Sequence, residues 1–240
     1  RHRGGVALLR QRRIGRANVM EVAEWGASRV HGARREARRF ERTHFGWPSQ
    51  GQAEYLAPEG YEVAYRTNAV TRHGEHGNAL LSRWPVISHR HEDISDHRFE
   101  QRGLLHVEVQ VGDARAAHSS QTAPISVHVI VVHLGLIPAS RVRQVAQLHK
   151  YIAREVPEDA PLLVAGDFND WGTRITRMMQ RESLHEWPSN AQPTYPSRLP
   201  MVQLDHVYAR GLRPVGQMVP HGKIWQRMSD HLPLLAKFER

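Results

Sequence analysis

The segment LLVAGDFNDWG, residues 162–172, decides the fold, because it joins an apolar run directly to a cluster of polar residues. A short apolar run of this kind is typical of a buried strand in an α/β sheet. Asp167 and Asn169 stand two positions apart, so their side chains project from the same side of an extended chain. A carboxylate beside an amide can orient a water molecule and hold a phosphate oxygen. Gly, Asp and Asn are also common turn formers, so the segment alone is equally consistent with a simple turn.

Apolar runs on both sides of this segment predict further strands. Several of them alternate apolar and polar residues with period two, as strands with one buried face do. The predicted strands cover residues 78–82, 104–111, 125–132, 161–165, 204–208 and 232–238. Strands in this number, with a helix between two of them, indicate an α/β fold.

One amphipathic helix is predicted between two of these strands. SRVRQVAQLHKYIAREV, residues 140–156, follows the rules for a helix that begins behind Ser140, an N-cap candidate. Its apolar residues recur at helical spacing and would share one face: Val142, Val145, Leu148, Ile152 and Val156. We expect this face to cover a sheet.

Length and composition limit the class of protein. A chain of 240 residues can bury one sizeable core, and we expect residues 1–240 to form a single domain. No apolar run reaches the roughly 18 residues of a membrane helix, and no signal-peptide pattern opens the chain. We therefore expect a soluble, cytoplasmic monomer with no transmembrane segment. The absence of cysteine excludes disulfides and cysteine-ligated zinc.

The positive charge is concentrated near the start of the chain. Residues 1–45 contain 12 Arg, four Glu and no Lys or Asp, so eight of the nine net positive charges lie there. This segment is atypical of a folded core, and only its second half has strong helix formers. A charge-rich stretch is more often a solvated face or a tail than a nucleic-acid-binding surface. Nucleic acid stays one of the candidate substrates.

Further acids and imidazoles stand at the ends of predicted strands. His133 ends the run HVIVVHLGL, Asp205 stands in LDHVYAR, and Asp230 with His231 precede the last strand in MSDHLPLLAKF. Each alone could be a hydrogen-bonded loop residue or a cap. Their recurrence at strand ends predicts one polar site, because α/β scaffolds gather their active sites there.

Five other histidines lie in polar stretches at spacings that could mimic a zinc site: His73, His76, His89, His91 and His97. Zinc requires three or four ligands on fixed elements. No recognised motif accompanies these residues. We therefore interpret them as parts of solvated or substrate-facing loops in preference to a zinc site.

Taken in order, the motifs resemble the endonuclease/exonuclease/phosphatase superfamily, which includes DNase I-like enzymes. The resemblance covers roughly residues 55–240 and rests on HGNALLSRWPV (76–86), VVHLGL, AGDFND, LDHVYAR and SDHLPL. It implies a four-layered α/β sandwich in which two central β-sheets are flanked by helices. NALLSRWPV, DHRFEQRGLLH and the compact C-terminus also resemble small bacterial members that are found near cardiolipin synthase genes.

The resemblance implies a catalytic role for five residues. Asp167 would orient or deprotonate the attacking water, and Asn169 would hold the phosphate and fix that carboxylate. His231 would donate a hydrogen bond to a phosphoryl oxygen, while Asp205 would fix its ring. His133 would contact the phosphate or protonate the leaving oxygen.

The resemblance also implies a substrate contact and a metal. Asn78 would contact the substrate, and Asp230 would bind Mg²⁺ or Mn²⁺, which suit oxygen ligands. The implied activity is hydrolysis of a phosphoester, in particular a phosphodiester, in a lipid headgroup, a small molecule or nucleic acid. The alternatives are a nuclease acting on DNA or RNA, and a catalytically impaired descendant that binds phosphate.

The family's principal metal ligand, a Glu in a Q-E-V strand, has two candidate positions. Reading backward from HGARREARRF places that position at Arg29, whereas a second register uses Glu21 in NVMEV. The flanking residues favour the first register. Arginine cannot coordinate a cation, so this register would weaken metal binding.

Overall fold

The computed structural model describes residues 6–14, 17–22, 52–71, 74–112, 124–186 and 192–239. Twelve strands and four helices lie in these ranges, which confirms the α/β class. The predictions for Arg29 and His73 lie outside the described residues. The single-domain assignment of residues 1–240 stays a prediction.

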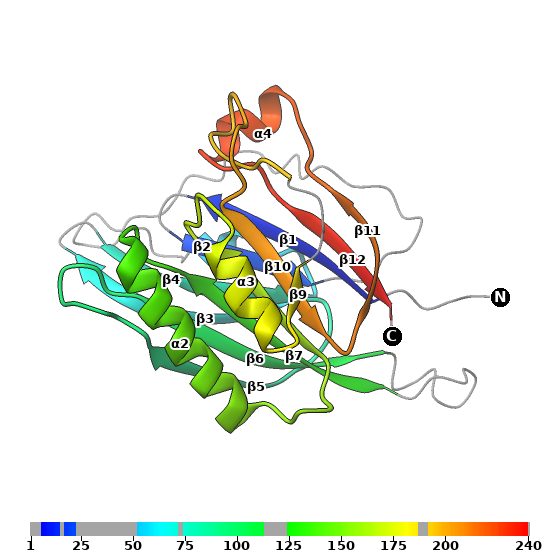
Figure 1. Cartoon of the computed structure of the whole chain (residues 1–240). Coiled ribbons are helices and arrows are strands. Elements are labelled where there is room, and N and C mark those ends of the chain that lie inside the picture. The colour runs from blue at the N-terminus through cyan, green and yellow to red at the C-terminus, as the bar shows by residue number, and fades with distance from the viewer. Residues whose placement is uncertain are drawn as a thin grey trace.

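The first sheet contains six strands in the order β11-β12-β1-β2-β4-β3. Their bounds are Arg213–Met218 (β11), Leu235–Glu239 (β12), Val6–Ile14 (β1), Ala17–Val22 (β2), Gly74–Ser82 (β4) and Glu62–Thr71 (β3). β2 runs parallel to β4, and the other neighbours are antiparallel. Figure 1 shows that β1 and β12 lie side by side, so strands from the two ends of the chain share one sheet.

The second sheet also contains six strands, in the order β5-β6-β7-β8-β10-β9. Their bounds are Val86–Asp93 (β5), Gly103–Val111 (β6), Ile125–His133 (β7), Leu162–Asp167 (β8), Asp205–Arg210 (β10) and His185–Glu186 (β9). β7 and β8 are parallel, and the remaining pairs are antiparallel. Both sheets are therefore mixed.

Apolar side chains from the two sheets meet in a central core. Leu80 and Phe238 of the first sheet pack with Val107, Val129 and Val207 of the second. All five are almost completely buried. Burial of one such side chain stabilises the fold by roughly 1.5–3 kcal/mol, so this interface supports both sheets.

Four helices lie in the described ranges: α1 (Gln52–Leu56), α2 (Pro138–Glu155), α3 (Arg174–Arg181) and α4 (Lys223–Met228). α2 and α3 cover the outer face of the second sheet, where Leu148 and Met179 pack on Ile130 (Figure 1). On the outer face of the first sheet, Ala53 of α1 packs with Leu81. No helix among the described residues is long and apolar enough to cross a membrane.

The six predicted strands are present, but the predicted start of the long helix is wrong. α2 has Ile137 as its N-cap, and Pro138 opens the helix. Proline fits the first turn because the backbone N–H that it lacks would have no helical partner there. Ser140 instead donates from Oγ to Oδ2 of Asp96 at 2.6 Å. The buried face of the helix was correctly predicted at Val145, among others.

Several strands were missed because their sequences are polar. Residues 6–22 contain β1 and β2, although at most a helix later in this arginine-rich segment was expected. His89 and His91 lie in β5, and His76 lies in β4, so the loop interpretation is wrong for these three. β5 is the edge strand of the second sheet, where polar and charged residues are common.

Candidate active site

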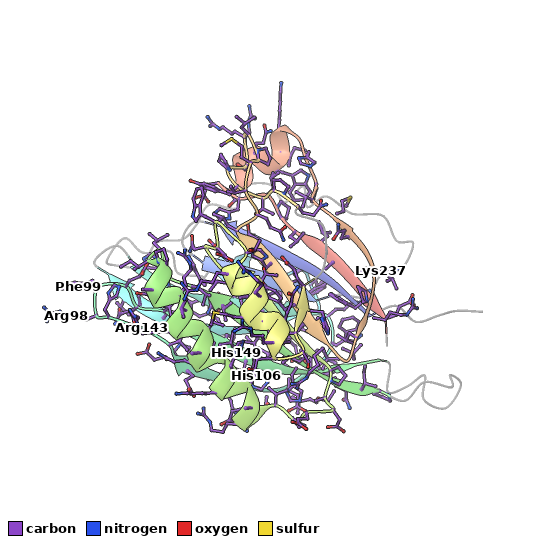
Figure 2. All side chains as sticks on the ribbon, in the orientation of Figure 1. Arg98, Phe99, His106, Arg143, His149 and Lys237 are labelled. Carbon is purple, nitrogen blue, oxygen red and sulfur yellow. The ribbon has the colours of Figure 1, made fainter. Side chains whose placement is uncertain are left out.

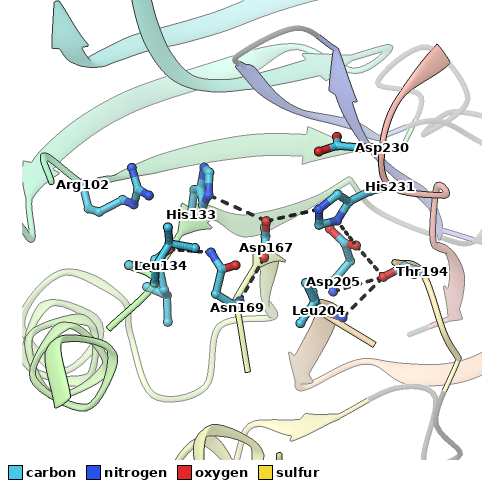
Figure 3. Close-up of polar contacts among 12 residues, drawn as sticks. Arg102, His133, Leu134, Asp167, Asn169, Thr194, Leu204, Asp205, Asp230 and His231 are labelled. Carbon is cyan, nitrogen blue, oxygen red and sulfur yellow. Dashed lines mark hydrogen bonds and ion pairs between the residues drawn. The ribbon is translucent and has the colours of Figure 1, made fainter. Parts of the chain in front are cut away.

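The ends of three neighbouring strands bring predicted residues together at one end of the second sheet. His133 ends β7 and stands opposite Asp167, the last residue of the parallel strand β8. Asp205 begins the antiparallel strand β10, also opposite Asp167. Figure 3 shows His133, Asp167, Asp205 and His231 converging there. Residues that are nearly a hundred positions apart thus meet because the strand ends meet.

Gly166 allows β8 to approach β7 closely beside the site. A Cβ atom at this position would lie 1.8 Å from the carbonyl oxygen of Val132, which no side chain can tolerate. The glycine of the AGDFND motif is therefore required by the contact between two strands. A side chain here would push the strand that carries Asp167 away from its neighbour.

Asn169 fixes the carboxylate of Asp167. Its backbone N–H donates to Oδ1 of Asp167 at 2.9 Å, and its side-chain Nδ2 donates to the carbonyl of Leu134 at 2.8 Å. Asn169 has a φ of 48°, a left-handed conformation that asparagine adopts more readily than most residues. The motif therefore connects the end of β8 to the loop that follows β7.

His231 is held by Asp205. Nδ1 of His231 and Oδ2 of Asp205 are 2.8 Å apart, and Thr194 donates from Oγ1 to the same oxygen at 2.5 Å. All three side chains are buried. This arrangement fixes the imidazole orientation and leaves Nε2 as the nitrogen that faces Asp167 (Figure 3).

Asp167 lies between two imidazoles. Its Oδ2 atom is 3.7 Å from Nε2 of His133 and 3.8 Å from Nε2 of His231. Both separations are longer than a hydrogen bond. An oxygen atom about 2.8 Å from each partner could therefore contact the carboxylate and an imidazole at once. The geometry suits a water molecule or a phosphoryl oxygen.

The surrounding carboxylates favour a protonated His231. Burial works against the charged ring, but the attraction of Asp205 and its hydrogen bond outweigh burial, with smaller contributions from Asp167 and Asp230. The result is a pKa above the usual value of 6.5 for histidine. A protonated imidazole is a hydrogen-bond donor at both nitrogens, and can stabilise developing negative charge.

One group of side chains in the described ranges could hold a metal ion. Potential ligand atoms of Asp167, Asp205 and His231 all lie within 4.8 Å of one another. Ligands around Mg²⁺ at about 2.1 Å lie at most about 4.2 Å apart, so the group would have to contract slightly. The two carboxylates suit a hard cation, whereas a proton on His231 would compete with it. The donor set therefore fits a divalent ion bound mainly through oxygen.

Two other predicted residues, Asp230 and Asn78, are not part of this group. Asp230 is exposed and directly precedes His231. Asn78 is buried, and its Nδ2 donates to the carbonyls of Gly103 at 2.8 Å and Val131 at 3.2 Å, which ties the two sheets together.

Glu21 is not brought to the group by the register of its strand. It stands opposite Leu81 in the parallel pair of β2 and β4, three positions after the pair of Asn18 with Asn78. Three residues span about 10 Å along a strand. After β4 the chain continues to Val86, which pairs with Val109. Val109 lies near one end of β6, whereas Gly103, the residue of β6 nearest the site, begins the other end. β4 therefore runs away from the site in the direction from Asn78 to Ser82. The backbone of Glu21 therefore lies farther from the site than that of Asn18.

Sequence reasoning missed the residues that shape the loop after β7. Arg141 is buried, and its Nη1 donates to the carbonyls of Gly135 at 3.1 Å and Leu136 at 2.7 Å. Gln144 accepts from the backbone N–H of Gly135 at 2.8 Å. Arg141 and Gln144 share one face of α2, and two polar residues beside an apolar face were the available signal. Thr194 gave no comparable signal, because it lies in an irregular segment.

Comparison with known proteins agrees with this architecture. Residues 3–231 match the model of the Endonuclease/Exonuclease/phosphatase family. The "Uncharacterized protein YbhP" of Escherichia coli strain K12 is 32% identical over 200 residues, which cover 80% of this chain and 74% of that protein.

Two solved structures share the fold. An endonuclease/exonuclease/phosphatase from Beutenbergia cavernae DSM 12333 has a TM-score of 0.60 and 21% identity, over 78% of this chain and 56% of that one. A mannosyl-6-phosphatase from Bacteroides thetaiotaomicron VPI-5482 has a TM-score of 0.57 and 14% identity, over 76% and 78% of the two chains. With the family match across most of its length, the chain belongs to the endonuclease/exonuclease/phosphatase family.

Proposed function

We propose that this chain is a divalent-metal-dependent hydrolase that cleaves phosphodiester bonds with an activated water molecule. The main support is the buried carboxylate of Asp167, which lies within 4 Å of the Nε2 atoms of both His133 and His231. Such a constellation combines a proton acceptor with two hydrogen-bond donors. Membership of a family of phosphoesterases supports the same reaction class.

Each residue has a distinct task in this proposal. Asp167 orients the attacking water and accepts its proton, while the backbone N–H of Asn169 holds the other carboxylate oxygen. His231 donates from Nε2 to a non-bridging phosphoryl oxygen as negative charge builds up in the transition state. Asp205 keeps the ring of His231 in the required orientation through Nδ1. His133 contacts the phosphate or protonates the leaving oxygen.

Asp230 and the carboxylates of Asp167 and Asp205 are the candidate ligands for Mg²⁺ or Mn²⁺. When bound, the ion would neutralise the phosphate and stabilise the leaving oxygen. Asp230 is exposed and lies beside His231 (Figure 3). Asn78 stays a weaker candidate for substrate contact, since its Nδ2 is already bonded to two backbone carbonyls.

A phosphate-binding protein with weak catalysis is the second candidate. The observation in its favour is the register of β2, which places Glu21 three positions past the level of Asn78. Nuclease activity is the third candidate function of the same site. Its affinity for DNA or RNA would fall steeply with salt, because phosphate contacts release counterions.

Hydrolysis of bis(p-nitrophenyl) phosphate in Mg²⁺ or Mn²⁺ tests the proposal. His231→Ala should lower kcat by about 10² or more, the loss expected when a transition-state donor is removed. His185→Ala is the matched control, because His185 is an exposed histidine on β9 away from the site. The control should retain the parent rate. Equal rates for His231→Ala and the parent would contradict the proposal.

A further inference from the structure

Large apolar side chains are exposed unevenly over the molecule. Ten are exposed among the described residues, and six of these stand on loops at the edge of the sheet that carries the site. We call these six the apolar rim: Phe99, Leu136, Ile137, Trp171, Leu199 and Met201. Their exposed fractions range from 48% to 83%. Single exposed apolar residues are ordinary, but a concentration of them around a site marks a binding surface.

One part of the rim is attached to the loop after β7. The backbone N–H of Leu136 donates to Oε1 of Glu100 at 3.0 Å, which connects Leu136 and Ile137 to the segment that carries Phe99. The same loop accepts the side-chain hydrogen bond of Asn169 at the carbonyl of Leu134. These three apolar residues therefore flank the side of the site that is formed by Asn169 and the loop after β7.

The other part of the rim leads directly to His231. The ring of Trp171 contacts that of Tyr195 edge to face, with centroids 6.2 Å apart. Tyr195 in turn lies 4.9 Å from the imidazole of His231. Leu199 and Met201 belong to the same segment, which is held to the site where the N–H of Ser197 donates to the carbonyl of Asp230 at 2.7 Å.

The rim is accompanied by positive charge. Arg98 and Arg198 are exposed next to rim residues, and the guanidinium of Arg98 lies 4.8 Å from the ring centroid of Phe99 (Figure 2). The two acidic side chains of the first segment each pair with an arginine: Asp96 with Arg143, and Glu100 with Arg102. Exposed apolar side chains interleaved with arginine are complementary to a partner surface that has anionic groups outside and an apolar layer directly below them.

We propose that the apolar rim docks the site on an anionic phospholipid bilayer, and that the substrate is the phosphodiester of a lipid headgroup. This inference rests on the proposed function. Aliphatic side chains gain free energy when they enter the region between headgroups and acyl chains, and Trp and Tyr prefer that interface. Arginine near an anionic membrane surface adds electrostatic attraction to the lipid headgroups.

The composition of the rim distinguishes this partner from two others. Nucleic-acid bases would be bound by aromatic or guanidinium faces, but Leu136, Ile137, Leu199 and Met201 offer no surface for stacking. A small soluble substrate would be enclosed by its site, whereas the rim side chains project outward around it. A membrane surface uses both the aliphatic and the aromatic members.

Vesicle binding in EDTA tests docking without hydrolysis. The protein should co-sediment with phosphatidylcholine vesicles that contain phosphatidylglycerol, and Phe99→Ser and Leu199→Ser should each lower the partition coefficient by about tenfold. Ile87→Ser is the matched control, because Ile87 is an exposed residue of β5 outside the rim. Arg98→Gln should lower binding about fivefold, and only on anionic vesicles.

A second readout compares two substrates in the presence of Mg²⁺. In the rim variants, the rate on vesicle phosphatidylglycerol should fall about tenfold relative to the rate on soluble bis(p-nitrophenyl) phosphate. Equal vesicle binding by the parent, the rim variants and Ile87→Ser would overturn docking, as would rim-dependent binding to single-stranded DNA without vesicle binding. Vesicle binding without hydrolysis of either substrate would support docking and contradict the proposed function.

Discussion

His231 and His106 are buried to almost the same extent, at 4% and 6% exposure, yet their surroundings favour a protonated ring at His231 and a neutral ring at His106. Around His231, the carboxylates of Asp205 and Asp167 outweigh the effect of burial and raise the pKa. Around His106, burial and the neighbouring His128 lower the pKa to about 4. Burial alone therefore does not set the charge of a histidine in this fold. The neighbours decide it.

The His106 network lies beneath α2, on the outer face of the second sheet (Figure 2). His106 Nδ1 is 3.0 Å from the hydroxyl of Tyr151, and His106 Nε2 is 2.9 Å from Nδ1 of His128. One proton on each link satisfies this chain with both rings neutral. We interpret it as a structural network, in contrast to the charged group at the site.

The largest effect that separates the two regions is expected from Asp167→Asn. The amide cannot accept a proton from water, so kcat for bis(p-nitrophenyl) phosphate should fall by roughly 10³. Tyr151→Phe is the matched control in the neutral network, because it also removes one polar group from a buried hydrogen-bonded cluster. It should lower stability and leave kcat within about twofold. A similar kcat for both variants would end the distinction between the regions.

Asp205→Asn tests whether the charge beside His231 matters for catalysis. The amide oxygen can still accept from Nδ1 of His231, but the negative charge that raises the pKa of this histidine is lost. The ring then has a neutral partner at Nδ1, as His106 has, while Asp167 stays charged near Nε2. We expect kcat to fall by about 10² with little change in KM, because the donor matters most in the transition state. An unchanged kcat would show that the charge of His231 has no role.

A smaller effect is expected on stability below neutral pH. His106 has a folded-state pKa near 4, below the value of 6.5 expected in the unfolded chain, and the pKa of His128 is also lowered, chiefly by burial. The unfolded state therefore binds more protons between about pH 6.5 and 4, and the free energy of unfolding falls as pH falls through this window.

Urea unfolding at several pH values checks this expectation. His106→Gln removes one titrating group, so the decline in the free energy of unfolding between pH 6.5 and 4 should be shallower than in the parent. Identical slopes in the parent and His106→Gln would mean that the network is not held neutral.

The site could be predicted from sequence wherever polar residues follow an apolar run. Asp167 and His133 end buried strands, and Asp205 begins one, so the alternation of the strands and the recurrence of such ends predicted their convergence. Asn169 was found because it belongs to the same short motif. Six of the strands and the long helix followed from apolar periodicity, whereas the two-sheet arrangement was implied only by the family resemblance.

Other features depend on contacts between distant parts of the chain, which local sequence patterns do not predict. Thr194 reaches Asp205 from an irregular segment, and the buried Arg141 is used to hold backbone carbonyls. The polar strand β5 is stabilised by pairing at the sheet edge, so its sequence has no apolar signature. β1 and β2, in the arginine-rich N-terminal segment, were also not predicted, because they depend on pairing with strands such as β4 and β12.

The dependence of hydrolysis on a divalent ion decides whether this chain is a metal-dependent phosphodiesterase. The rate on bis(p-nitrophenyl) phosphate is measured after dialysis against EDTA, and again as Mg²⁺ or Mn²⁺ is restored. We expect activity to be lost in EDTA and to return with the added ion, because carboxylates at the site fit a hard cation. Full activity in EDTA would contradict it.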